Sequence, residues 1–167
     1  MNLYIQRHAI AVDRGTKGYK TDSERPLTDK GAKKMQRIAE GMLALHLSFD
    51  GILSSPFVRA RETAGIVADV LHAKRKLEFT DDLQVGGDPG KLIDFIKTKY
   101  KPGSSILLVG HEPYLSGLIS TLVVGDDKLP IMMKKGGVCK LSVAELRYGK
   151  CATMEWLLTP HQLTRMR

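Results

Sequence analysis

The amino-acid sequence predicts an α/β fold, a three-layer α/β/α sandwich around a mostly parallel central sheet. Short apolar segments, typical of strands, alternate along the chain with longer segments whose apolar residues recur at helical spacing. The segment SSILLVGH at 104–111 reads as one continuous apolar strand, which is typical of a sheet covered on both faces. Two apolar segments near the C-terminus flank a turn and predict an antiparallel hairpin at one side of the sheet.

The first part of the chain is expected to form a strand, a long loop and a helix. NLYIQ at 2–6 is a short apolar strand, and residues 9–27 are polar and contain Gly15, Gly18 and Pro26. A loop of that length in a compact domain tends to be functional or disordered. Thr28 is expected to cap a helix over 29–47, whose apolar residues fall at 35, 38, 39, 42 and 45.

A second strand and a second helix follow. FDGILSS at 49–55 is expected to be a buried strand, and Ser55-Pro56 combines an N-cap residue with proline at the first helical position. LEFT at 77–80 is expected to be a third, short strand. The helix between them carries one apolar stripe, formed by Phe57, Ala60, Ala64, Val67, Ala68 and Leu71.

The remaining elements complete the alternation. Asp88-Pro89 again pairs a capping residue with proline, before a helix that runs through about Lys99. The strand at 104–111 leads into a helix over 112–124, and the segments 139–146 and 153–159 are expected to form a hairpin around Tyr148-Gly149.

Length and composition indicate one domain over residues 1–167, because 43% of the residues are apolar and 26% are charged. Arg7 interrupts the first apolar segment before a signal peptide could form, and no stretch approaches the roughly 20 apolar residues that span a bilayer. Cys139 and Cys151 fit neither a CxxC pair nor a disulfide framework. We therefore expect a cytoplasmic protein that does not enter a membrane.

The net charge of +8 and the pI of about 9.5 favour anionic partners. Only 6% of the residues are aromatic, and no recognition motif or arginine-rich arm is present, so nucleic acid is not the expected partner. An anionic small molecule or a phosphoprotein suits the charge equally well. Arg14, Lys17 and Lys20, on the loop after the first strand, either guide an acidic phosphoprotein or are solvated loop charge.

Three predicted strands end in polar residues that can do chemistry. Arg7-His8 follows the first strand, Ser54-Ser55 leads from the second strand to Arg59, and His111 follows the strand at 104–109. In open α/β sheets, ligands bind beyond the carboxyl ends of the strands. Arg59 would lie in the first turn of a helix, where free N–H groups and the helix dipole already favour an anion.

Two histidines and two arginines at one site favour phosphoryl transfer. Guanidinium groups offer paired donors that match the tetrahedral face of a phosphate, and a histidine can act as nucleophile, acid or base. A metal site is the weaker interpretation, because the neighbours are cationic and no carboxylate–histidine cluster has ligand spacing. No metal and no cofactor are expected.

Four sequence blocks resemble the histidine phosphatase (phosphoglycerate mutase-like) superfamily. They are RHA at 7–9, TDSERPLTDKG at 21–31, SSPFVRARETA at 54–64 and LLVGHEP at 107–113, in the order that the superfamily has them. The short chain and the RPLTDKG block most resemble the bacterial SixA-type phosphohistidine phosphatases, as does the tail EWLLTPHQL at 155–163. The resemblance covers nearly the whole chain and implies the phosphoglycerate mutase-like fold.

The resemblance also implies roles for individual residues. His8 matches the nucleophile that takes the phosphoryl group, and Arg7 and Arg59 match the arginines that hold its oxygens. His111 matches the second histidine, which stabilises the transferring group. Arg25, in ERPLT, is expected to bind substrate in the same pocket.

Two departures from the superfamily pattern bear on function. Ala9 replaces the usual glycine of Arg-His-Gly, and a methyl group is tolerated there only if φ is negative. The glutamate that acts as general acid in the mutases and many larger phosphatases is also missing; Val85 stands near its place, and Asp81, Asp82 and Asp88 are the nearby acids. An alkoxide leaving group needs a proton donor, whereas an imidazole, with a conjugate-acid pKa of about 6.5, needs much less help.

The missing acid therefore favours phosphohistidine on a signalling or phosphotransfer protein as the substrate. Two alternatives stay open at this point. One is a phosphomonoesterase for small phosphate esters that uses a loop aspartate as its acid, and the other is a catalytically weak phosphoprotein-binding module. A mutase is less expected, because the chain lacks insertions that would hold a sugar phosphate.

Overall fold

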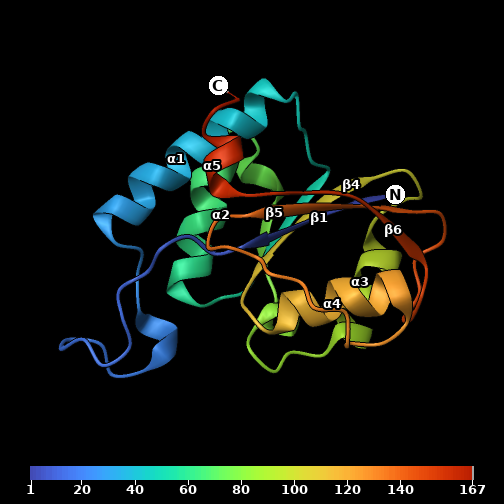
Figure 1. Cartoon of the computed structure of the whole chain (residues 1–167), viewed down its shortest axis with the longest axis horizontal. Helices are drawn as coiled ribbons and strands as arrows, with labels where there is room; N and C mark the ends of the chain where they lie inside the picture. Colours follow the sequence, from blue (N-terminus) through green and yellow to red (C-terminus); the bar gives the residue numbers. More distant parts are fainter. Residues whose placement is uncertain (167) are drawn as a thin grey trace.

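The computed structural model describes residues 1–166 and contains one six-stranded sheet with helices on both faces (Figure 1). The strands are β1 (Asn2–Arg7), β2 (Gly51–Ser54), β3 (Leu77–Phe79), β4 (Ser105–Gly110), β5 (Val138–Val143) and β6 (Ala152–Leu158). The α-helices are α1 (Asp29–Ala44), α2 (Val58–Val70), α3 (Pro89–Lys99), α4 (Tyr114–Val124) and α5 (Pro160–Leu163). Three short 3₁₀ helices, η1 (Asp22–Glu24), η2 (Lys74–Lys76) and η3 (Asp81–Leu83), lie in the connections.

The sheet has the strand order β3-β2-β4-β1-β5-β6. The first four strands in this order pair in parallel, β5 runs antiparallel to β1, and β6 runs antiparallel to β5. The predicted mostly parallel sheet and the closing hairpin are therefore confirmed. Because β2, β4 and β1 are parallel neighbours, their carboxyl ends lie at one edge, where Ser54 pairs with Val109 and Arg7 with Gly110.

Alternate residues of the inner strands build two separate core layers. Leu3 and Ile5 of β1 pack with the apolar residues of α3 and α4, whereas Tyr4 packs with those of α1 and α2. Figure 1 shows the same division, with α1, α2 and α5 on one side of the sheet and α3 and α4 on the other. The strands are thus apolar on both faces, as a three-layer α/β/α sandwich requires. No helix among residues 1–166 is long and apolar enough to cross a membrane.

Two of the three expected helix caps are confirmed, and one is wrong. The side chain of Thr28 accepts a hydrogen bond from Gly31 N at 2.9 Å, and that of Asp88 accepts from Gly90 N and Lys91 N. The helix expected to start at Ser55-Pro56 instead has Phe57 as its N-cap and begins at Val58. The Ser55 hydroxyl is engaged with the imidazole of His111, 2.8 Å away, and receives only a longer bond from Phe57 N.

The hairpin strands also differ in length from the prediction, which placed them at 139–146 and 153–159. β5 ends at Val143 and β6 begins at Ala152, so the connection around Tyr148-Gly149 is a longer loop. Glu145 and Arg147 in this connection are exposed, so apolar spacing alone extended the first strand too far.

The polar segment at 9–27 folds back on itself. Ala11 forms a β-bridge with Leu27, Val12 N donates to Pro26 O at 2.9 Å, and Thr28 N donates to Ile10 O at 3.0 Å. These bonds close the segment at its base and hold η1 beside the carboxyl end of β1. The loop is therefore an ordered part of the edge at which the predicted site residues lie.

Gly31 makes this closure possible. It lies in the first turn of α1, and a Cβ atom placed on it would come within 2.0 Å of Ile10 O. A side chain at this position would push the backbone that follows His8 away from α1. The glycine of the RPLTDKG block therefore has a packing role.

Gly31→Ala is expected to lower the free energy of unfolding by about 1–3 kcal/mol, the usual cost of overpacking. Gly65→Ala is the matched control, because a Cβ at Gly65 in α2 meets no atom within 4 Å. Its better helix propensity should raise stability by about 0.5–1 kcal/mol. Urea unfolding of both variants checks the prediction, and a stability change of the same sign in both would contradict it.

Candidate active site

Two buried histidines meet where β1 and β4 end. His8 directly follows β1 and His111 directly follows β4, and His8 N donates to Gly110 O at 3.0 Å. The two imidazole rings lie with their centroids 5.2 Å apart, and the residues are 6% and 1% exposed. The parallel pairing of the two strands therefore brings together histidines that are about a hundred residues apart in sequence.

The ring of His8 is held in one tautomer and one orientation. Its Nδ1 lies 2.7 Å from Ala9 O, and since a carbonyl can only accept, Nδ1 carries the proton. Nε2 therefore has the free lone pair, and Arg59 Nε donates to it at 3.3 Å. Burial, and the charges of His111, Arg59 and Arg7, lower the pKa of His8 to about 3, so the ring is neutral at physiological pH.

His111 is also neutral at physiological pH. Burial and the charge of Arg59 lower its pKa to about 3. Its Nε2 is hydrogen-bonded to the Ser55 hydroxyl at 2.8 Å, and the Phe57 ring packs on it with centroids 5.0 Å apart. Its Nδ1 is buried and has no partner among the described residues, which leaves one polar atom for a ligand.

Arg59 connects the histidines to the loop. It is the second residue of α2 and is only 2% exposed. Besides the contact with His8, its Nη1 donates to Asp22 O at 2.6 Å and its Nη2 to Asp22 Oδ2 at 2.8 Å. Thr63, one turn later, accepts a hydrogen bond from Ala9 N at 3.0 Å and donates to Arg59 O at 2.6 Å. Helix α2 thus fixes both the guanidinium and the backbone that follows His8.

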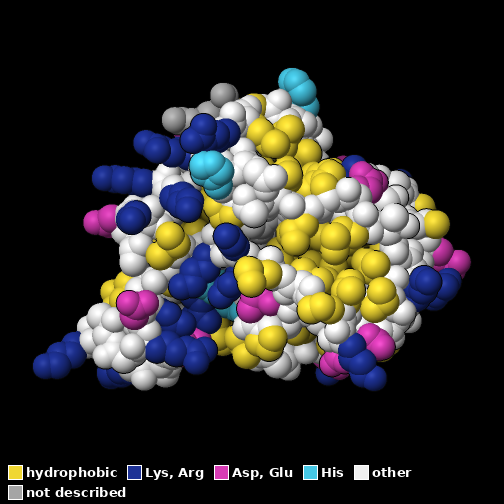
Figure 2. All heavy atoms as spheres, viewed as in Figure 1, with side chains coloured by type: hydrophobic (Ala, Val, Ile, Leu, Met, Phe, Trp, Pro, Cys, Tyr) yellow, Lys and Arg dark blue, Asp and Glu magenta, His cyan; other side chains and the backbone are white. Residues whose placement is uncertain are grey.

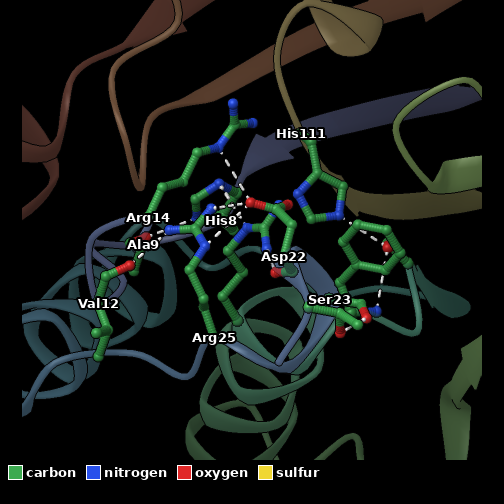
Figure 3. A network of polar contacts seen from close by, with 12 residues as sticks. His8, Ala9, Val12, Arg14, Asp22, Ser23, Arg25 and His111 are labelled. Atoms are coloured by element: carbon green, nitrogen blue, oxygen red, sulfur yellow. Dashed lines mark hydrogen bonds and ion pairs between the residues drawn. The ribbon is translucent and has the colours of Figure 1, made fainter. Parts of the chain in front are cut away.

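Asp22, in η1, places a carboxylate among three guanidinium groups. Its Oδ1 accepts from Arg14 Nε at 3.1 Å and from Arg25 Nε and Nη2 at 3.0 and 2.7 Å, and its Oδ2 accepts from Arg59. Figure 3 shows Arg14 and Arg25 pointing toward this carboxylate. Although partial burial opposes it, hydrogen bonds from Arg25 and Arg59 lower the pKa of Asp22 to about 2. The carboxylate is therefore ionised at any working pH.

The structure brings some of the predicted residues together directly and others through intermediates. His8, His111 and Arg59 are neighbours, whereas Arg25 reaches them only through Asp22 and also donates to Val12 O. Arg7 donates to Met133 O at 2.8 Å, and its Nε is buried without a partner among residues 1–166. Its charge contributes to the lowered pKa of both histidines.

A hollow beside the site has a volume of about 590 Å³ and is lined by the loop residues 14–16, 19–22 and 25, together with Phe57 and Val85. His8, His111 and Arg59 do not line it, and Phe57, which packs on His111, lies between it and the histidines. Asp22 is its only acidic lining residue in the described part of the chain. We did not expect Asp22 from the sequence, although its place three residues before Arg25 in TDSERPLT is the spacing of a local ion pair.

The three expected candidates for a general acid do not line this hollow. Asp88 caps α3, Asp81 accepts a hydrogen bond from Gln84, and Asp82 is bonded to Thr80. Each carboxylate thus has a local structural partner.

Ala9 fits the backbone without strain. The non-glycine residues with positive φ in the described chain are His46 and His72, so Ala9 does not need the conformational freedom of glycine. Its methyl group is 3% exposed and belongs to the core layer under α1 and α2. Among residues 1–166, no three His, Cys, Asp or Glu side chains are grouped so as to hold a metal ion.

Comparison with known proteins gives one consistent result. Residues 3–84 match the model of the histidine phosphatase superfamily (branch 1). The chain is 32% identical to the phosphohistidine phosphatase SixA homolog of Haemophilus influenzae, over 73% of this chain and 77% of that one. It is 27% identical to phosphohistidine phosphatase SixA of Escherichia coli, over 98% and 96% of the two chains.

Structural comparison agrees. The solved structure of the protein histidine phosphatase SixA complexed with tungstate superposes with a TM-score of 0.83 at 26% identity, over 98% of this chain and 99% of that one. The fold that the sequence resemblance implied is thereby confirmed.

The two neutral histidines predict a loss of stability in acid. Histidine in the unfolded chain titrates near pH 6.5, whereas His8 and His111 in the folded chain titrate near 3. The unfolded state therefore binds more protons than the folded state in this pH interval. The contribution of the two neutral histidines to the free energy of unfolding is complete above pH 6.5 and is lost as the pH falls toward 3. Each histidine contributes up to about 1.4 kcal/mol per pH unit.

His8→Asn removes one of the two groups and is expected to flatten this fall in the free energy of unfolding. Urea unfolding between about pH 4.5 and 7.5 measures it, with the pH interval set by the two histidine pKa values. His161→Asn, at an exposed position, is the control. An unchanged slope in the His8 variant would show that His8 is not held neutral.

Proposed function

Because the chain belongs to the histidine phosphatase superfamily, we propose that it is a metal-independent, cytoplasmic phosphatase that removes the phosphoryl group from phosphohistidine on a signalling or phosphotransfer protein. His8 is the proposed nucleophile, and a phosphohistidine at His8 is the proposed intermediate. The observation that carries the proposal is the His8 ring, whose Nε2 is unprotonated and accepts a hydrogen bond from Arg59 Nε. Both cysteines are free, as is usual in the cytoplasm.

The proposed reaction has two steps. In the first, the His8 Nε2 lone pair forms a bond to phosphorus, the bond from phosphorus to the substrate nitrogen breaks, and its electron pair stays on the leaving imidazole. In the second, water attacks phosphorus, inorganic phosphate leaves, and the lone pair returns to His8. Arg59 and Arg7 would stabilise the charge on the equatorial oxygens, because guanidinium groups fixed in advance cost no reorganisation during the reaction.

The substrate class follows from what the hollow lacks. Its only acidic lining residue among those described, Asp22, has a pKa of about 2 and so cannot donate a proton at neutral pH. Both histidines are neutral and therefore poor acids. An alkyl ester would have to leave as an alkoxide in such a site, whereas an imidazole leaves without that requirement. The relatives named phosphohistidine phosphatase support the same substrate class.

The two alternatives have less support. An esterase would need an acid from residues 81–88, and the three aspartates there have structural partners outside the hollow. A silent binding module would not need a histidine with an unprotonated Nε2 beside an arginine.

A basic face adjoins the site and supports a protein partner. It consists of six side chains on α1 and on the loop before β5, namely Lys30, Lys33, Lys34, Arg37, Lys134 and Lys135. Two shallow hollows cross it, of about 430 and 380 Å³; they share Lys34, and the second also reaches Arg7. No described Asp or Glu lines either hollow, and none of the six forms an ion pair within residues 1–166.

Figure 2 shows the molecule in the view of Figure 1. Lys and Arg side chains gather on the side that α1 occupies, and hydrophobic side chains gather on the other side of the view. Because the field of unpaired cations steers anionic molecules, the basic face suits an acidic protein surface around the phosphorylated residue. A small ester would not extend across it.

His8→Ala is expected to lower the hydrolysis of p-nitrophenyl phosphate by at least roughly a thousandfold, since loss of the nucleophile leaves only binding and electrostatic assistance. With a ³²P-labelled phosphoprotein, denaturing quench should trap acid-labile label on the parent enzyme at His8. His46→Asn is the control, at an exposed histidine that follows α1, where asparagine tolerates the positive φ of the position. A His8 variant as active as the parent would disprove the mechanism, and equal turnover of a phosphohistidine protein and an alkyl phosphate would disprove the substrate class.

Charge reversal on the basic face is expected to affect only a macromolecular substrate. Lys30→Glu, Lys33→Glu and Lys135→Glu together should lower kcat/KM for a phosphohistidine protein by roughly tenfold at low salt, and less at high salt. The matched control reverses three exposed lysines on the opposite side of the sheet, Lys91, Lys97 and Lys101. Hydrolysis of p-nitrophenyl phosphate should stay within about twofold in both triples. Equal losses in the two triples would show that only net charge matters.

A further inference from the structure

The carboxylate of Asp22 can accept a further hydrogen bond besides those from its three arginines. Oδ1 accepts three N–H groups, from Arg14 and Arg25, whereas Oδ2 accepts only one, from Arg59. A carboxylate oxygen has room for a second donor. The Asp22 side chain is 36% exposed and lines the hollow, so its carboxylate can be reached from there.

Asp22 also lies where a leaving group has to pass. A phosphoryl group on its way to His8 Nε2 would lie beside Arg59, and its leaving group would lie in line on the side away from His8. His8 and Arg59 are almost completely buried, and the hollow that Asp22 and Arg25 line also reaches Phe57, whose ring packs on His111. Asp22 is bonded to the Nη atoms of Arg59, at the end of that guanidinium away from the Nε that faces His8.

We propose that Asp22 selects a nitrogen leaving group, because its carboxylate accepts a hydrogen bond from the far ring N–H of the protonated phosphoimidazole of the substrate. This inference rests on the proposed function and names the residue that gives the same site its substrate class. Asp22 is then a catalytic residue that touches the leaving group, in addition to its contacts with the arginines.

The step balances without a general acid. The substrate ring carries a proton on the nitrogen that is not bonded to phosphorus, and this N–H donates to Asp22. When His8 Nε2 bonds to phosphorus, the electron pair of the broken P–N bond stays on the leaving nitrogen. The ring departs as neutral imidazole and keeps its proton. An ester oxygen has no such N–H, and Asp22, with a pKa of about 2, cannot give it a proton.

The surrounding charges make a carboxylate at this position necessary for a cationic ring. Arg14, Arg25 and Arg59 all donate to Asp22, so the hollow would present only repelling cations to a protonated imidazole if Asp22 were absent. Arg14 is 79% exposed, whereas Arg25 is 13% and Arg59 2% exposed. The two buried arginines therefore hold the carboxylate in place at the hollow.

Asp22→Asn tests this inference with two small substrates whose leaving groups differ in charge. Phosphoimidazole loses a ring with an N–H, and p-nitrophenyl phosphate loses an anion that needs no acid. We expect kcat/KM for phosphoimidazole to fall roughly tenfold to a hundredfold, the effect of losing a hydrogen bond to a charged group. For p-nitrophenyl phosphate, whose leaving group has no N–H for Asp22, it should fall less or rise, so the ratio of kcat/KM for phosphoimidazole to that for p-nitrophenyl phosphate should fall.

The pH dependence of phosphoimidazole turnover is a second test of the inference. The parent should turn over phosphoimidazole faster as the pH falls and the ring gains its proton, and Asp22→Asn should lose this advantage. Asp13→Asn is the matched control: the same change of charge at an exposed position in the same loop. Because the inference concerns the ratio of the two substrates in one sample, a partly unfolded variant gives the same ratio as a fully folded one.

The possible outcomes are distinct. If kcat/KM of Asp22→Asn falls equally for both substrates, Asp22 only positions Arg59. If it rises equally for both, Asp22 is only a counter-ion of the arginines. Either result overturns the inference. A parent that prefers phosphoimidazole and a variant that keeps this preference would also overturn it, while the proposed function stands. A parent that hydrolyses an alkyl phosphate as fast as phosphoimidazole would instead overturn the proposed function.

Discussion

A buried guanidinium in the first turn of α2 links every part of the site. Arg59 is nearly inaccessible to water, so each of its N–H groups needs a partner, because an unpaired buried charge is strongly destabilising. Its partners come from the end of β1 through His8 and from η1 through Asp22. Thr63, one turn further along α2, holds the backbone N–H of Ala9. Burial of one arginine therefore sets the position of the nucleophile, the loop and the carboxylate together.

The same arrangement determines which protonation states are available. Burial and the nearby cations lower the pKa of His8 and His111 to about 3. Burial opposes the shift at Asp22, but hydrogen bonds from Arg25 and Arg59 lower its pKa to about 2. The fixed cations therefore serve two purposes in the proposed mechanism, because they keep the imidazole unprotonated, as a nucleophile must be, and offer N–H donors to an anion. The proton donor that an alkoxide needs is what such a field removes. The proposed preference for a nitrogen leaving group thus has the same physical origin as the proposed binding of phosphate.

Much of this could be predicted from the sequence, because it depends on local patterns. Apolar runs located the strands, their polar ends located His8, His111 and Arg59, and side-chain caps located the starts of α1 and α3. Two features depend on the folded geometry instead. Ser55 looks like an N-cap, but the pairing of β2 with β4 places its hydroxyl next to His111. Asp22 looks like an ordinary loop acid, and only the folding back of residues 9–27 brings it to Arg59.

The positive charges of the protein fall into two groups, the basic face and the arginines that contact Asp22, and we propose a different task for each group. The cations of the basic face, which form no ion pair within residues 1–166, line two hollows, one of which reaches Arg7. The charge of Arg7 also acts on both histidines. The arginines that contact Asp22, in contrast, are compensated by its carboxylate. A long-range field attracts an anionic partner from any direction, whereas a single carboxylate at contact distance acts only on the group next to it. The two proposals are therefore compatible: the basic face would attract acidic proteins in general, and Asp22 would discriminate between leaving groups that have an N–H and those that do not.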